Sequence, residues 1–152
     1  MTGNSKNPIS VSIIGGSGYT GAELMRIVSG HPYFKLVQVI ANRNAGKKIQ
    51  DIFPHLRHLN LPDFISFEKM IFEGLDLIIC ALPHATSQEI IVKIPEEIKI
   101  IDLSADFRLE KVEEYERWYG QKHLAPSLQE NAVYGLTEIY KKNCLLYTSP
   151  ST

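Results

Sequence analysis

The sequence predicts an α/β fold in which helices cover both faces of a doubly wound, mostly parallel sheet. Short apolar or β-branched runs alternate along the chain with segments of helical spacing, and this alternation is typical of strand-helix-strand units. Glycine-rich and polar residues follow directly after the apolar runs, which is where such sheets bind their ligands. The 152 residues give room for one ordinary domain.

The amino-terminal half supplies two strands and two helices. The run Ile9–Ile14 is short and β-branched, so it predicts a strand. Apolar residues at helical spacing predict a helix over Ala22–Val28, which a following glycine and proline end. Phe34–Ala41 predicts a second strand, and Phe67–Phe72 predicts a short helix.

The carboxyl-terminal half continues the alternation. Leu75–Leu82 is nearly all apolar, as a strand buried on both faces would be. Ser87–Lys93 predicts a short helix, because Thr86 and Glu89 have the spacing of a capping box. The remaining elements are a strand over Ile98–Leu103, a polar helix over Glu110–Tyr119 and a short strand over Asn131–Tyr134.

Composition and charge exclude several classes of protein. The net charge is −1, so bulk charge gives no support for binding to nucleic acid or to a membrane surface. Cys80 and Cys144 are too few for a disulfide scaffold and lack the spacing of a metal site. No apolar run reaches the ~18 residues of a membrane span, and the polar start lacks an apolar secretory signal. We therefore expect a cytoplasmic protein that binds a small molecule, and no nucleic acid, membrane or metal.

Four glycines lie between the first predicted strand and the first predicted helix. They form the pattern G-x-G-x-x-G with one more glycine ahead of it, in the order Gly15, Gly16, Ser17, Gly18, Tyr19, Thr20 and Gly21. Thr20 and Glu23 have the spacing of a capping box, which predicts that the helix begins at Gly21. Free N–H groups and the helix dipole at that point favour an anion, and the missing Cβ atoms let a pyrophosphate approach. The loop therefore predicts a Rossmann-type dinucleotide-binding fold, with a tight turn under a closely packed helix as the alternative.

The end of the second predicted strand favours NADP over NAD. NAD-binding proteins usually carry an acid there, which bonds the ribose 2′-hydroxyl. No acid lies between Val39 and Gln50, and Arg43 follows the strand instead. A guanidinium grips a 2′-phosphate in two places, whereas a carboxylate would repel it. A solvated loop with ordinary surface charges is the alternative.

Six stretches of the sequence together resemble a known family. In chain order they are GGSGYTGAEL, NRNAGKKIQDIFPHLR, ALPHATS, IDLSADFRL, YERWYG and AVYGLTE. They resemble the amino-terminal part of N-acetyl-γ-glutamyl-phosphate reductase, and the resemblance extends over residues 9–142. It implies a two-domain cytoplasmic oxidoreductase of arginine biosynthesis that is a homo-oligomer. Such an enzyme uses NADPH to reduce an acyl phosphate to an aldehyde and releases phosphate.

The resemblance also implies roles for residues that follow the later strands. The residues on the nicotinamide side of the cofactor would be Leu82, Pro83 and His84. For His84 the alternative is a loop histidine bonded to nearby backbone. Ser104 and Arg108 would bind substrate, since a guanidinium makes bidentate bonds with a phosphate or a carboxylate. Asp106 would be mainly support, and it could equally hold Arg108 in a structural ion pair.

The resemblance places the catalytic thiol outside this sequence. In the family a cysteine thiolate attacks the acyl phosphate, and the resulting thioester accepts the hydride. That cysteine lies in an N-P-G-C stretch after the motif Tyr134-Gly135-Leu136, and this sequence contains no such stretch. We expect Cys80 to be a small core residue, since a buried thiol without a cation beside it is a poor nucleophile. The neighbours of Cys144 do not match the family, so we assign no catalytic residue and expect the chain by itself to be inactive.

The expected domain organisation follows from these boundaries. Residues 1–8 are predicted to be a flexible tail, and residues 9–143 to be the NADP-binding domain, with the catalytic domain missing. Residues 144–152 depart from the family pattern and are predicted to be a tail foreign to the native protein.

Two other functions stay open at this point. One is the related reductase that acts on a carrier-protein-bound aminoadipyl phosphate, because the substrate pocket that separates the two lies mostly beyond residue 152. The other is an NADP-binding module without catalysis, with which the missing nucleophile is consistent.

Overall fold

The computed structural model describes residues 7–135 of the chain. Contacts between residues divide the described chain into two units. The first unit holds residues 7–82 and 94–103, and the second holds residues 83–93 and 104–135. The tail predicted at residues 144–152 and most of the tail predicted at residues 1–8 lie outside the described residues. The single domain expected over residues 9–143 stays a prediction.

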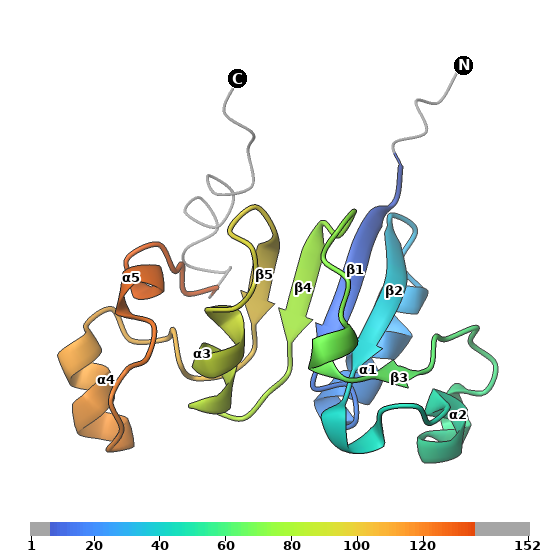
Figure 1. Cartoon of the computed structure of the whole chain (residues 1–152), viewed down its shortest axis with the longest axis horizontal. Coiled ribbons are helices and arrows are strands. Elements are labelled where there is room, and N and C mark those ends of the chain that lie inside the picture. The colour runs from blue at the N-terminus through green and yellow to red at the C-terminus, as the bar shows by residue number, and fades with distance from the viewer. Residues whose placement is uncertain (1–6, 136–152) are drawn as a thin grey trace. The chain divides into compact units, whose positions relative to one another are not determined.

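The five strands of the described chain belong to the first unit and form one parallel sheet (Figure 1). In chain order they are β1 (Ile9–Ile14), β2 (Phe34–Ile40), β3 (Phe64–Ile65), β4 (Leu77–Cys80) and β5 (Lys99–Asp102). Their order in space is β3-β2-β1-β4-β5, and every neighbouring pair is parallel. The predicted parallel sheet is thereby confirmed. The carboxyl ends of the strands share one edge, and the strand order reverses between β1 and β4.

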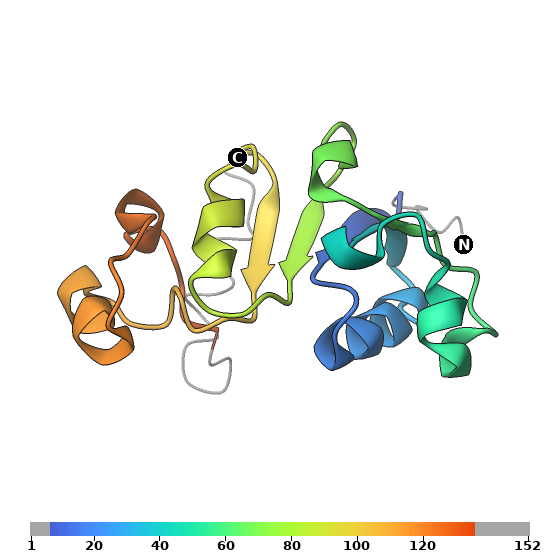
Figure 2. The same cartoon turned by 60° about the horizontal axis from the view of Figure 1, so that its bottom comes forward.

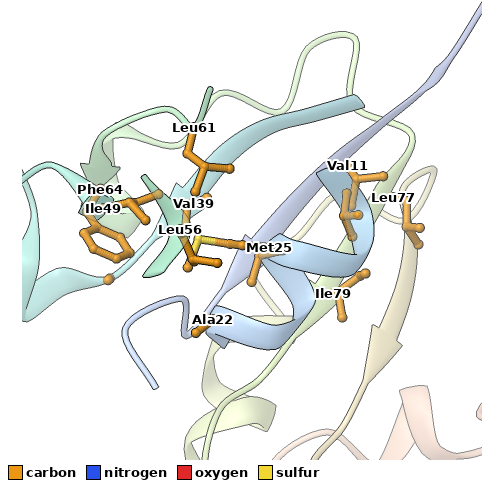
Figure 3. Close-up of a cluster of buried hydrophobic side chains, with 13 residues drawn as sticks. Val11, Ala22, Met25, Val39, Ile49, Leu56, Leu61, Phe64, Leu77 and Ile79 are labelled. Atoms are coloured by element: carbon orange, nitrogen blue, oxygen red, sulfur yellow. The ribbon is translucent and has the colours of Figure 1, made fainter. Parts of the chain in front are cut away.

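The core of the first unit lies between the sheet and helix α1 (Tyr19–Ser29). The last four residues of β1 and all four residues of β4 are buried, as expected for strands with neighbours on both sides. Helix α1 buries Ala22, Met25 and Val28 in the same cluster as Val39 of β2 and Phe64 of β3 (Figure 3). The spacing of three residues between them along α1 places these side chains on one face.

The segment between β2 and β3 completes this core with three short helices. They are η1 (Asn42–Asn44), α2 (Ile49–Ile52) and η2 (Pro54–Leu56), cyan to green in Figure 2. Ile49 and Leu56 are buried in the cluster, so the segment is anchored although it contains little regular structure.

The connection from β3 to β4 is held by a side chain of β2. It contains only the turn η3 (Phe67–Lys69), after which Gln38 clamps the backbone of Ile71. Gln38 Nε2 donates to the Ile71 carbonyl (2.8 Å), and the Ile71 N–H donates to Gln38 Oε1 (2.9 Å). These bonds take the place of helical ones, so the helix predicted over Phe67–Phe72 is wrong beyond its first turn. The rule of right-handed crossovers places this connection on the sheet face opposite α1, as a doubly wound fold requires.

The second unit contains three helices within the described residues: α3 (Thr86–Ile91), α4 (Val112–Tyr119) and α5 (Pro126–Gln129). Helix α4 ends at Tyr119 as predicted but begins two residues later than predicted, and Gly120 after it has the left-handed conformation (φ +66°) that ends many helices. The ring of Tyr115 stacks on Tyr119 at 4.8 Å between centroids and meets His123 edge-on at 4.9 Å. No helix of the described chain is long and apolar enough to span a membrane.

The capping box predicted for α1 is wrong. The helix begins at Tyr19, because the Gly18 carbonyl already accepts the Ala22 N–H at 2.9 Å. Thr20 therefore lies inside the first turn, and Glu23 pairs with a residue further along the helix, accepting from Arg26 Nε at 2.9 Å.

Other element boundaries also differ from the prediction. Helix α3 begins at Thr86, so the Thr86–Glu89 capping box is absent and Ala85 is the cap. The strand predicted at Asn131–Tyr134 is wrong, because the amides of Asn131 and Ala132 bond to the carbonyls of Leu128 and Gln129 at the end of α5. The two-residue strand β3 and the short helices α2 and α5 were not predicted.

We expect Met25→Ala to lower the free energy of unfolding by about 2–5 kcal/mol, because the fully buried Met25 side chain leaves a cavity under α1. Ile27→Ala on the same helix is the matched control, since Ile27 is 49 % exposed and its loss changes stability by less than about 1 kcal/mol. Urea unfolding followed by circular dichroism measures both. Equal effects of the two substitutions would contradict the described face of α1.

Candidate functional site

The first unit brings several predicted site residues to the carboxyl edge of the sheet. The glycine loop follows β1, Arg43 lies in η1 directly after β2, and Leu82 lies two residues after β4. Because the three strands are parallel neighbours, their carboxyl ends lie at the same edge. The sequence prediction of a common edge therefore holds for these three positions.

Three glycines of the loop are required by the packing of the protein itself. A Cβ on Gly15, which has φ +86°, would lie 2.3 Å from the Ala81 carbonyl oxygen. A Cβ on Gly16 would lie 2.1 Å from the Val39 side chain, and one on Gly21 would lie 2.6 Å from the Gly15 carbonyl oxygen. The alternative explanation, a tight turn under a closely packed helix, accounts for these three residues.

Gly18 differs from the other three glycines. Its backbone is extended (φ −90°, ψ 171°), a conformation that any residue adopts. A Cβ there would meet only the Gly15 carbonyl oxygen, at an ordinary 3.8 Å. Packing within the described chain therefore does not account for a glycine at this position.

Some backbone amides of the glycine loop donate hydrogen bonds within the protein, and others have no acceptor there. The N–H groups of Gly15 and Gly16 both donate to the Ile40 carbonyl, each at 3.0 Å, and they are therefore occupied. The amides without an acceptor among residues 7–135 are those of Ser17, Tyr19, Thr20 and Gly21. The last three belong to the first turn of α1, where the helix dipole also favours an anion. The Tyr19 side chain is 95 % exposed and leaves this turn open to solvent.

In the turn that carries Arg43, the two flanking asparagine side chains are hydrogen-bonded, whereas the Arg43 guanidinium has no partner among the described residues. The Asn42 side chain accepts the Phe67 N–H at 2.8 Å, and the Asn44 side chain accepts from Lys47 Nζ at 3.1 Å. Arg43 itself is exposed, and its guanidinium has no partner among the described residues. Both neighbours of Arg43 are thus fixed while its charge stays available to an anionic group.

Cys80 is a core residue, as predicted. Its side chain is fully buried in β4, and burial raises the pKa of the thiol to about 12, with the nearby Asp102 carboxylate adding to the effect. A nucleophilic thiol needs the opposite environment, one that stabilises the thiolate. Cys144 lies outside the described residues.

The second unit holds the remaining predicted site residues. Pro83 and His84 are exposed, and the His84 ring lies 5.9 Å from that of Tyr119. Arg108 is also exposed, with its guanidinium carbon 6.0 Å from the centre of the Tyr134 ring. Ser104 is half-buried, and its Oγ accepts the Asp106 N–H at 3.0 Å, so its hydroxyl already has a structural role.

Asp106 supports the second unit but not through the ion pair considered above. Within residues 7–135 it makes no salt bridge with Arg108. Its buried carboxylate instead accepts hydrogen bonds from the Ala85 N–H (2.8 Å), the Tyr115 hydroxyl (2.8 Å) and the Gln88 N–H (3.3 Å). Burial, with Asp106 adding to it, raises the pKa of Tyr115 to about 12, so the phenol stays protonated and donates.

Sequence reasoning missed Ala85, the one non-glycine residue of the described chain with a positive φ. Its angles are φ +66° and ψ −43°, a region that costs about 1–3 kcal/mol for a residue with a side chain. An alanine gives no signal of such a conformation in the sequence, whereas a glycine would have.

We expect iodoacetamide at pH 8 to leave Cys80 unmodified in the folded chain and to label it in urea. With a pKa of about 12, only about one thiol in ten thousand is ionised at that pH, and the side chain is also inaccessible. Mass spectrometry of the peptide that contains Cys80, in a Cys144→Ser background, measures the labelling. Labelling of the folded chain at the unfolded rate would contradict the buried position.

The sequence of the chain matches a known protein family and several curated relatives. Residues 10–146 match the family described as semialdehyde dehydrogenase, NAD binding domain. N-acetyl-gamma-glutamyl-phosphate reductase of Rhodobacter capsulatus is 52% identical over 132 residues, which are 87% of this chain and 39% of the relative. The protein of the same name from Jannaschia sp. is 50% identical over 131 residues, or 86% of this chain and 38% of the relative. The chain thus spans about two fifths of the length of these curated relatives.

Two solved structures have a fold similar to that of this chain. Aspartate semialdehyde dehydrogenase with NADP from Candida albicans matches with a TM-score of 0.58 and 21% identity, covering 70% of this chain and 32% of that one. Aspartate semialdehyde dehydrogenase II from Vibrio cholerae matches with a TM-score of 0.51 and 14% identity, covering 68% and 30%. At such identities the likeness shows the fold alone. The family match over residues 10–146 establishes that the chain belongs to the semialdehyde dehydrogenase NAD-binding domain family.

Proposed function

We propose that this chain is the cofactor-binding part of an enzyme that uses NADPH to reduce N-acetyl-glutamyl 5-phosphate to its semialdehyde, with release of phosphate. The observation that carries the proposal is the loop after β1, where unused amides meet a glycine that the fold itself does not require. The curated relatives at 50–52% identity carry the name of this reductase, which favours it over the aminoadipyl and module alternatives.

The pyrophosphate of the cofactor is assigned to the first turn of α1. The amides of Tyr19, Thr20 and Gly21 are the donors, and the missing Cβ of Gly18 lets the phosphate oxygens reach them. Gly15, Gly16 and Ser17 contribute by bringing the chain from β1 into this turn. Anions at a helix start gain from both the free N–H groups and the dipole.

The 2′-phosphate that distinguishes NADP from NAD is assigned to Arg43. The guanidinium is exposed and unpaired within the described residues, on a turn that two asparagine side chains hold. No acid stands between Val39 and Gln50 to repel the phosphate. A bidentate arginine–phosphate pair is among the stronger charge-assisted contacts.

The reaction itself needs groups from two further places. We assign Leu82, Pro83 and His84 to the nicotinamide side and Ser104 and Arg108 to the substrate, because they follow β4 and β5 at the ligand-binding edge of such sheets. The thiolate that attacks the acyl phosphate is not assigned here, since Cys80 is buried and protonated. Attack by such a thiolate would expel phosphate and leave a thioester, and bound NADPH would supply the hydride that turns this thioester into the aldehyde and frees the thiolate. A cytoplasmic homo-oligomer is part of the same proposal, and its support is the resemblance alone.

We expect the chain to bind NADPH more tightly than NADH, and Arg43→Ala to remove most of the difference. Loss of the arginine–phosphate contact weakens NADPH binding by about tenfold or more and leaves NADH binding unchanged. Lys35→Ala is the control, because this exposed lysine lies at the opposite end of the same strand, β2. Titration of the cofactor fluorescence gives the dissociation constants. Equal affinities for the two cofactors in the unsubstituted chain would remove Arg43 from the site.

We expect Gly18→Ala to fold normally and to bind NADPH at least about tenfold more weakly. The new methyl group has space within the protein but stands where the pyrophosphate approaches. Gly30→Ala is the control at the other end of α1, where an added Cβ meets nothing closer than 3.5 Å. Thermal melts test folding, and the fluorescence titration tests binding. Unchanged NADPH affinity of a folded Gly18→Ala variant would sink the pyrophosphate assignment.

A further inference from the structure

Asp106 is a buried carboxylate whose partners come from three parts of the second unit. The side chain is fully buried, so its oxygens require hydrogen bonds in place of water. Oδ1 accepts from the Ala85 N–H and from the Tyr115 hydroxyl, both at 2.8 Å. Oδ2 accepts from the Gln88 N–H at 3.3 Å, inside the first turn of α3. One side chain thus ties the turn before α3 to α4.

The backbone of Asp106 is fixed as well. Its N–H donates to Ser104 Oγ at 3.0 Å, and its carbonyl lies 3.1 Å from His123 Nε2. His123 Nδ1 accepts the Ala125 N–H at 3.2 Å, so the proton of the neutral ring is on Nε2, which donates to the Asp106 carbonyl. The carboxylate is therefore held in place by bonds that do not involve the turn it supports.

The backbone N–H that Asp106 binds belongs to Ala85, whose backbone conformation is strained. Ala85 has φ +66° and ψ −43°, and its N–H is the donor to Oδ1. Ala85 directly follows Pro83 and His84, whose side chains are exposed. A strained peptide persists only where its surroundings enforce it. Here the enforcing contact is the charge-assisted hydrogen bond that the Ala85 N–H donates to the fully buried Asp106 carboxylate.

The order of the strands indicates which half of a dinucleotide this turn would meet. In folds of this strand order the adenosine ribose is read at the end of β2 and the pyrophosphate lies at the end of β1. The nicotinamide half then extends to the other side of β1, toward the end of β4. Pro83–Ala85 is the segment of chain that follows the end of β4.

We propose that Asp106 is a positioning residue that holds the Pro83–Ala85 turn in the conformation that receives the nicotinamide half of the cofactor. The inference rests on the proposed function, because it presumes that the chain binds a nicotinamide dinucleotide. Asp106 itself touches no cofactor and acts through the Ala85 peptide.

Binding of two different ligands distinguishes a positioning role of Asp106 from a general effect of its loss on the fold. NADPH contacts the whole site, whereas 2′-phospho-ADP-ribose lacks the nicotinamide and depends on the glycine loop and Arg43 alone. We expect Asp106→Asn to weaken NADPH binding by about tenfold and to change 2′-phospho-ADP-ribose binding by less than about twofold. Tyr115→Phe is the matched control: it removes another hydrogen bond to the same carboxylate but leaves the Ala85 contact, so NADPH affinity is retained.

Relief of the strain gives a second test. A glycine at position 85 adopts a positive φ without strain. We therefore expect Ala85→Gly, introduced into the Asp106→Asn chain, to restore at least half of the lost NADPH affinity on a logarithmic scale. A role of Asp106 in stability alone would show no such rescue at residue 85.

Hydrogen exchange of the Ala85 amide tests the contact in the unsubstituted 152-residue chain and needs no variant. We expect a protected amide, and exchange as fast as at an exposed site would overturn the inference even if Asp106→Asn fails to fold. Equal weakening of both ligands by Asp106→Asn, or of neither, would also overturn it. If the unsubstituted chain binds neither ligand while the Ala85 amide is protected, the proposed function is what fails, and this inference falls with it.

Discussion

The backbone of residues 15 and 16 lies so close to the neighbouring strands that no side chain fits there. One carbonyl, that of Ile40, accepts both of their N–H groups, and the Ala81 carbonyl stands where a Cβ of Gly15 would be. This contact joins the carboxyl ends of β2, β1 and β4 through the loop itself. The position of α1 depends on it as well, because Gly21 packs directly on the backbone of Gly15 and Gly16.

The same contact determines which parts of the loop are left for a ligand. Contacts within the protein account for three glycines and for three amides, those of Gly15, Gly16 and Gly18, so the donors that remain are concentrated in the first turn of α1. Gly18 stands at the start of that turn, where an added Cβ would make only one ordinary contact. The glycine-rich pattern therefore serves two separate purposes, and the structure distinguishes them residue by residue.

The sheet was predictable from the sequence, because its signals are local. The runs of β1, β2, β4 and β5 are apolar and β-branched, and each was placed within two residues of its ends. Strand β3 was not predictable, since two residues have no periodicity and pair only because β2 is already beside them. The capping boxes failed for a similar reason. Thr20 and Thr86 have the right spacing, but each lies one or more residues inside a helix whose start is determined by contacts elsewhere.

Residues of the candidate site could be predicted from the sequence where the residue type itself indicates the role. The glycines and Arg43 could be named from pattern and charge, and the burial of Cys80 followed from the apolar run around it. The partners of Asp106 could not be named, because Ala85, Gln88 and Tyr115 are 21, 18 and 9 residues away and come together only in the folded unit. An acid two residues before an arginine suggests an ion pair, and only the fold shows that its oxygens face the other way.

The clamp of Gln38 on Ile71 restricts what position 38 can be. Both the N–H and the C=O of one residue, Ile71, are bonded by the end of a single side chain, at 2.9 and 2.8 Å. A side-chain amide carries its donor and its acceptor on two atoms side by side, which a hydroxyl or an imidazole ring does not, and asparagine is one methylene shorter. If related chains keep glutamine at this position, the reason is that it holds the β3–β4 connection against the sheet. Its conservation would not indicate a catalytic role.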